Sequence, residues 1–287
     1  MDIRKVQKTG DMFYMYLPTA WCKKLGVDSK ARVIVEQMSD GALSVHPFST
    51  IKKKSHLELQ YPESNQAILH RLIFACYMSP ADTFSIELKK KLDFAKVLDQ
   101  KKLMSLELVE IDHNHITSES TMSIPDPAAL LKTMIKKVKN LIMVMKKQWG
   151  DELIGKYEEE IDRSKLLIKK GVVYGLVKGS NHKAIDLFYI AQIAQHLERM
   201  VDHLICLKKP QPKLLNQLED LSKELLVLME SQDKMRVENI LSLQKKIAAL
   251  ENVSVKDVET YDRRRAIRSW AIIAEIIMDW AVLQELE

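Results

Sequence analysis

The sequence has few cysteines and no long apolar run, and both absences restrict what the chain can be. Its 287 residues include only three cysteines, with no CxxC pair. This argues against a disulfide framework and a thiolate zinc site, and it fits a reducing compartment. No run of about 18 uncharged apolar residues is present, and the start, MDIRKVQKTG, lacks the apolar segment of a signal peptide. We therefore expect a cytoplasmic protein that does not insert into a membrane.

Familiar catalytic motifs are missing as well. The chain has no GxxxxGK phosphate loop, no HExxH motif and no recognisable pairing of a nucleophile with a base. A ferritin-like di-iron site would need Glu-x-x-His, but Val201 stands three residues after Glu198. We therefore expect that the protein is not an enzyme.

The net charge is small, but it is unevenly distributed. Residues 1–56 contain ten Lys or Arg and five Asp or Glu, so this segment carries the whole formal charge of +5. A basic end of this kind favours nucleic acid or another polyanion as a partner, although a generic basic surface would look the same. The length allows two or more domains with a substantial core.

Residues 1–50 have the pattern of a small β-α-β-β unit. The predicted strands are Arg4–Gln7, Phe13–Leu17, Arg32–Met38 and Ala42–Pro47. Pro18 suits the start of a short helix that Gly26 ends, and Asp40-Gly41 is a hairpin signal. Fifty residues bury too little surface to be stable alone, so we expect a homodimer.

Residues 51–123 predict a small α/β linker domain. Apolar spacing indicates helices at 65–77 and 92–102, and alternation indicates strands at 83–88, 106–111 and 115–121.

Residues 124–287 predict an all-α domain. Asp126 followed by Pro127 is a helix start. Amphipathic segments cover 127–148, 151–170, 181–207, 213–230, 233–250 and 257–286, and a break is expected between Gly171 and Ser180. Six helices with short connections favour an antiparallel bundle. They divide into repeats 124–209 and 210–287, so the fold class is multidomain α+β.

Three acidic pairs lie at a spacing of four residues on these predicted helices. They are Glu158 with Asp162, Glu198 with Asp202, and Glu275 with Asp279. This spacing places both carboxylates on one helix face. Carboxylates from two facing helices would make an oxygen site for iron, manganese, magnesium or zinc. Spacing alone leaves a second interpretation open, because acidic pairs are also common on solvated helix faces.

Around these pairs the chain resembles a known family. Glu198-Arg199-x-x-Asp202-His203 resembles the ERIGDH signature of PhoU domains, and Glu158-x-x-Ile161-Asp162-Arg163 resembles their second-helix acidic motif. The resemblance covers about 124–287. It implies a double three-helix bundle, a divalent or ferric metal held by Glu158, Asp162, Glu198 and Asp202, and a role in repressing the phosphate-starvation response.

The second repeat departs from this pattern. Ile276 and Trp280 replace the Arg and His of the motif, and Gln244 and Ala248 stand where two acids belong. We therefore expect one intact metal site, and a structural role for Glu275 and Asp279.

The first fifty residues resemble the AbrB/SpoVT swapped-hairpin DNA-binding domain. The matching segments are residues 4–10, Leu17-Pro18-x-x-Trp21, Leu25-Gly26-Val27 and Asp40-Gly41-x-Leu43, while Lys30-Ala31 replaces the usual Gly-Asp. The resemblance implies an intertwined homodimer that contacts double-stranded DNA. The residues expected at the DNA are Arg4, Lys5, Lys8, Lys23 and Lys24.

Two hypotheses for the function follow. In the first, the chain is a DNA-binding transcriptional regulator of phosphate uptake and homeostasis. In the second, it is an adaptor of the PhoU type that binds no DNA and regulates a phosphate transporter or a sensor kinase by protein contact. The basic excess in residues 1–56 favours the first.

Overall fold

The chain has a mixed α+β fold that is mostly helical. A computed structural model describes residues 3–37, 41–48, 55–90, 106–111, 115–120, 126–149, 152–207, 209, 211–231, 235–250 and 254–285. It divides into two compact units, Met1–Lys53 and Lys54–Glu287. The predicted division into domains 1–50, 51–123 and 124–287 stays a prediction.

The described residues of the first unit form two short hairpins and one helix. Strands β1 (Gln7–Thr9) and β2 (Met12–Tyr14) pair antiparallel, as do β3 (Val33–Gln37) and β4 (Leu43–Pro47). Helix α1 (Thr19–Leu25) lies between the hairpins in the chain and ends at Gly26, whose φ of 66° suits glycine. The element order agrees with the prediction, but the first two strands are shorter and shifted.

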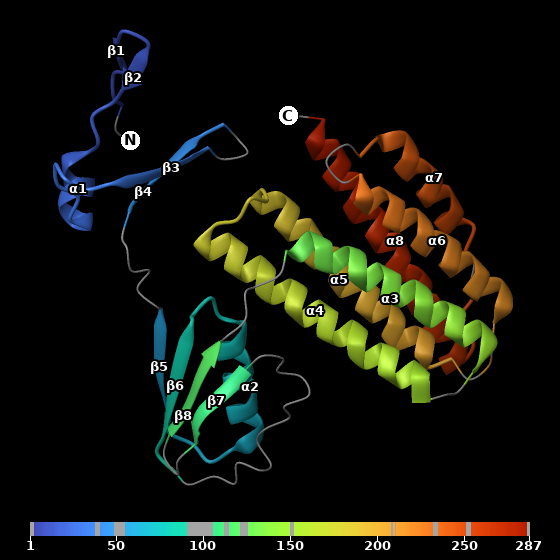
Figure 1. Ribbon diagram of the computed structural model, residues 1–287. Helices are drawn as coiled ribbons and strands as arrows, with labels where there is room; N and C mark the ends of the chain where they lie inside the picture. The colour runs from blue at the N-terminus through green and yellow to red at the C-terminus, as the bar shows by residue number, and fades with distance from the viewer. Residues whose placement is uncertain are drawn as a thin grey trace. The chain divides into compact units, whose positions relative to one another are not determined.

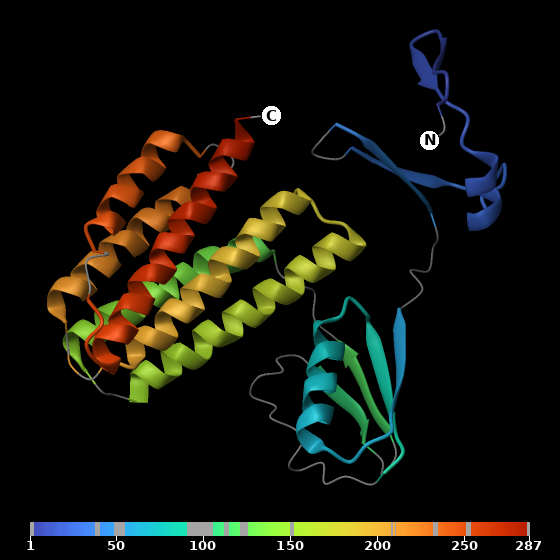
Figure 2. The same cartoon turned by 180° about the vertical axis from the view of Figure 1, so that it is seen from behind.

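The second unit begins with a four-stranded sheet in the order β5-β6-β8-β7. These strands are β5 (His56–Tyr61), β6 (Thr83–Leu88), β7 (Leu106–Ile111) and β8 (His115–Ser120). Helix α2 (Gln66–Met78) connects the parallel pair β5 and β6, and Figure 2 shows it across one face of the sheet. Leu69 and Ile73 of α2 pack with Ile86 and Ile116 of the sheet in one apolar core. The helix predicted at 92–102 lies outside the described residues.

In the described residues after the sheet, six long helices form a bundle (Figure 1). They are α3 (Pro127–Lys147), α4 (Glu152–Lys178), α5 (Ala184–Ile205), α6 (Pro212–Glu230), α7 (Val237–Ala248) and α8 (Val258–Gln284). Their apolar faces meet in one large core. Helix α3 begins as predicted, since the Asp126 side chain accepts a hydrogen bond from the backbone N–H of Ala128 at 3.0 Å. No helix within the described ranges is long and apolar enough to cross a membrane.

The break predicted between Gly171 and Ser180 is wrong for most of that range. Helix α4 continues through Gly171 and Gly175 to Lys178, and Gly179, with a φ of 90°, follows its last residue. A Cβ atom at Gly175 would lie 2.9 Å from Cδ1 of Leu187 on α5. Glycine here therefore lets α4 and α5 approach closely, and this packing outweighs its low helix propensity.

Candidate metal centre and nucleic-acid interface

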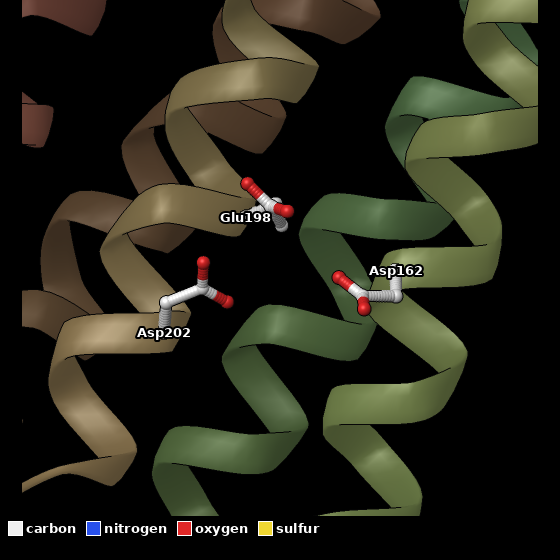
Figure 3. Close-up of side chains that lie close together, drawn as sticks. All are labelled: Asp162, Glu198 and Asp202. Atoms are coloured by element: carbon white, nitrogen blue, oxygen red, sulfur yellow. The ribbon is translucent and has the colours of Figure 1, made fainter. Parts of the chain in front are cut away.

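Two facing helices bring three of the predicted carboxylates together. Asp162 is on α4, and Glu198 and Asp202 are on α5 (Figure 3). One carboxylate oxygen from each lies within 4.8 Å of the others. We call these three residues the acidic cluster. The i,i+4 spacing on α5 explains why Glu198 and Asp202 face the same helix.

Glu158 lies one turn before Asp162 on α4 and borders the acidic cluster. Its carboxylate is not among the three grouped oxygens, but its charge contributes to raising the pKa of Asp202. Burial, followed by the charge of Asp162, raises the pKa of Glu158 itself. Glu158 is therefore close enough to add negative charge to the cluster.

The cluster is electrostatically costly for the folded chain. Glu198 is 8% exposed, and burial is the main cause that raises the pKa of its carboxyl group. Burial and the nearby Asp162 likewise raise the pKa of Asp202. Like charges that approach this closely in a partly dry site repel each other, and a cation would relieve that repulsion.

The donor set fits a hard cation. Three carboxylates that converge from two rigid helices resemble the oxygen ligands that magnesium, manganese and ferric iron prefer, and zinc also accepts carboxylate oxygen. Asp162, Glu198 and Asp202 would be the ligands, with Glu158 in reach of the same region.

A lysine side chain supplies one positive charge to the acidic cluster. The ammonium group of Lys165, on α4, donates a hydrogen bond to Oε1 of Glu198 and forms an ion pair with it. Its charge partly opposes the rise in the pKa of both Glu198 and Asp202. The sequence analysis missed this residue. Its position three residues after Asp162, on the same helix face, was the available signal.

Two polar residues near the acidic cluster, His203 and Glu160, interact with other side chains outside the cluster. Nδ1 of His203 lies 2.9 Å from Oδ1 of Asp262 on α8, so this histidine links two helices. Glu160, which stands in the same acidic run as Glu158, pairs with Lys137 at 2.9 Å and with Arg163 at 2.6 Å.

The second repeat presents fewer carboxylates. Helices α7 and α8 border a hollow of about 290 Å³ whose lining includes Gln244, Ala248 and Glu275. Glu275 lies 3.5 Å from Arg268, and the Asp279 side chain is on an exposed part of α8. Trp280, at the histidine position of the motif, is buried and stacks on Tyr189. The hollow therefore lacks the donors of the first site.

The predicted DNA-contacting residues all lie in the first unit and are all exposed. They are Arg4, Lys5, Lys8, Lys23 and Lys24. Arg4 and Lys5 precede β1, Lys8 is within β1, and Lys23 and Lys24 are in the last turn of α1. Nζ of Lys8 lies 5.4 Å from the centre of the Phe13 ring.

Many large apolar residues of the first unit are exposed as well. None of the residues described in this unit is buried. Phe13 is 70% exposed, Tyr16 65% and Val35 55%. One copy of the unit therefore has no hydrophobic core of its own, and such surfaces are typical of association sites.

Comparison with family models, curated proteins and solved structures finds no match to this chain.

Proposed function

We propose that the chain is a DNA-binding transcriptional regulator of phosphate uptake and homeostasis, with a metal-binding helical domain similar to PhoU. The acidic cluster is the observation that supports the metal-binding helical domain in this proposal. Asp162 comes from one motif segment, and Glu198 and Asp202 come from the other, and these segments lie on adjacent helices. If the acidic pairs were only parts of solvated helix faces, there would be no reason for two motifs that are distant in the sequence to lie together.

The first unit is proposed to be an AbrB/SpoVT-like swapped-hairpin dimer. Its two hairpins and its many exposed apolar residues support this arrangement, because none of the residues described in this unit is buried. Interleaving two copies would give the strands β1 to β4 the core that one copy lacks.

DNA is proposed to bind the basic residues of this dimer. Exposed Lys and Arg side chains neutralise phosphates and release counterions, which supplies affinity without sequence readout. Two copies would double the number of such residues. The metal site is proposed to hold iron, zinc, manganese or magnesium, with Asp162, Glu198 and Asp202 as ligands and Glu158 beside them.

Replacing Lys5 and Lys8 together by alanine tests the DNA assignment. The variant should bind duplex DNA more weakly, and the slope of log affinity against log salt should fall by roughly one for each lost phosphate contact. Fluorescence anisotropy across a salt series measures both quantities.

The control removes the same charge from elsewhere. Lys136 and Lys147 are exposed on α3, so their double alanine variant should keep the wild-type slope. An unchanged slope in the Lys5/Lys8 variant would remove the assignment of the basic residues to DNA.

The alternative function is an adaptor that contacts a phosphate transporter or a sensor kinase. The exposed apolar residues of the first unit are compatible with it, because the unit would then serve only for dimerisation. A folded dimer that retains no DNA at low salt, and that captures a transporter or kinase, would favour the adaptor.

A further inference from the structure

Both oxygens of the Glu198 carboxylate already have donors. Lys165 donates to Oε1, and Nε2 of Gln195 donates to Oε2 at 3.3 Å. A metal ion that takes Glu198 as a ligand must therefore compete with at least one of these donors.

Of the two donors, Lys165 is the one that opposes a metal ion. Its ammonium is a compact positive charge, which would repel a second cation at the same carboxylate. Its side chain is 21% exposed and therefore only partly covered by neighbouring residues. The flexible four-carbon stem allows the charge to leave the cluster while the backbone of α4 stays in place.

We propose that Lys165 is a tethered cation that holds Glu198 in the metal-free protein and is displaced when a metal ion binds. Lys165 thereby sets the metal concentration at which the site fills. This inference rests on the proposed metal site and adds its regulation. The metal-free and metal-bound states would differ locally in two ways. In the metal-bound state the Lys165 ammonium would be displaced, and Asp162, Glu198 and Asp202 would be ordered around the ion.

Replacing Lys165 by methionine removes the competing charge and keeps much of the side-chain volume. The full-length variant should bind manganese(II) about tenfold more tightly than the wild type, a coupling of ordinary size between two competing ligands. The electron paramagnetic resonance signal of free aqueous manganese, followed in a titration of each metal-free protein, gives the dissociation constant directly.

Two further variants control for charge and position. Lys165→Arg keeps a positive charge, so it should bind manganese no more tightly than the wild type. Lys137→Met removes a lysine of similar exposure that pairs with Glu160, outside the acidic cluster, and should leave the affinity unchanged. Circular dichroism establishes that each variant is folded, and Lys165→Gln, a second neutral substitution with the same expected gain in affinity, keeps the test valid if the methionine variant does not fold.

The outcomes separate the inference from the function on which it rests. If Lys165→Met binds manganese more tightly than the wild type and the control variants do not, the result supports both the metal site and the role of Lys165. If the wild type binds manganese and Lys165→Met binds it equally or less tightly, or if Lys165→Arg gains as much, the metal site stands and the role of Lys165 is overturned. If neither wild type nor Lys165→Met binds manganese at millimolar concentration, the metal site and the role of Lys165 both fall.

Discussion

At the scale of single residues, Lys170 is an unusual case of a buried charge. Its side chain belongs to α4 and is 7% exposed, and its Nζ lies 3.8 Å from the centre of the Tyr77 ring of α2. Burial lowers the pKa of Lys170 from its ordinary 10.5 to about 8. The folded protein therefore holds this proton less tightly than the unfolded chain does.

The lowered pKa gives a pH-dependent contribution to stability. Below about pH 8 the Lys170 ammonium is charged in the folded state. The full free-energy cost of burying this charge then reduces the stability of the folded protein. Between pH 8 and 10.5 the unfolded chain binds more protons than the folded chain, so stability rises with pH in this window.

Lys170→Met should therefore be more stable than the wild type at pH 7, by roughly 1–3 kcal/mol after the lost cation–π contact is subtracted. The difference should shrink as the pH approaches 10.5. Urea unfolding at pH 7 and pH 10 measures it, with the exposed neighbour in Lys169→Met as the control. A less stable methionine variant at pH 7 would show that the contact with Tyr77 outweighs the cost of burial.

Sequence reasoning reached some residues of the site and missed others for a physical reason. Helix periodicity placed Glu198 and Asp202 on one helix face, and the resemblance to PhoU domains selected this pair together with Glu158 and Asp162. Lys165 and Gln195 could not be selected in the same way. Their roles depend on how α4 and α5 are placed against each other, and a lysine on a helix is ordinarily solvated.

At the scale of the elements, two glycines of α4 have opposite environments. A Cβ atom at Gly155 would meet no atom within 4 Å, whereas one at Gly175 would meet Leu187 and Ser180 at 2.9 and 3.3 Å. Leu187 is 1% exposed, so it has little room to move.

Gly155→Ala should stabilise the protein by about 0.5–1 kcal/mol, because alanine has the higher helix propensity. Gly175→Ala should destabilise it by about 1–3 kcal/mol, because overpacking against Leu187 exceeds the same gain. Thermal and urea unfolding of both variants provides the measurement, and each variant serves as the other's control. Stabilisation by both substitutions would mean that α4 and α5 do not approach closely at Gly175.

The helix boundaries predicted from the sequence were accurate where they depended on local signals, and wrong where they depended on tertiary packing. The predicted starts and ends of α3, α5, α6 and α8 lie within three residues of those observed, because caps and apolar periodicity are local signals. The end of α4 was placed too early, since glycine in a sequence signals a break. Whether a glycine breaks a helix or allows a neighbour to approach depends on tertiary packing. Strand β5 was also missed, although its residues alternate in exposure.

At the scale of the whole molecule, the first unit leads us to expect that the protein is a dimer. Because none of its described residues is buried, we expect the full chain to sediment as a dimer of the 33.1 kDa subunit. Val35→Glu, in β3, should weaken the dimer by placing a charge in its core. Val227→Glu, at a similarly exposed position of α6, is the control. Analytical ultracentrifugation over a concentration series would contradict this expectation if the wild type were monomeric throughout.

The proposed role as a DNA-binding regulator is best tested by measuring how the full-length protein binds duplex DNA across a series of salt concentrations. We expect measurable binding at low salt, and log affinity should fall linearly as log salt rises, with a slope that corresponds to several phosphate contacts. The absence of binding at every salt concentration, from a protein shown to be folded and dimeric, would contradict the proposed role as a DNA-binding regulator.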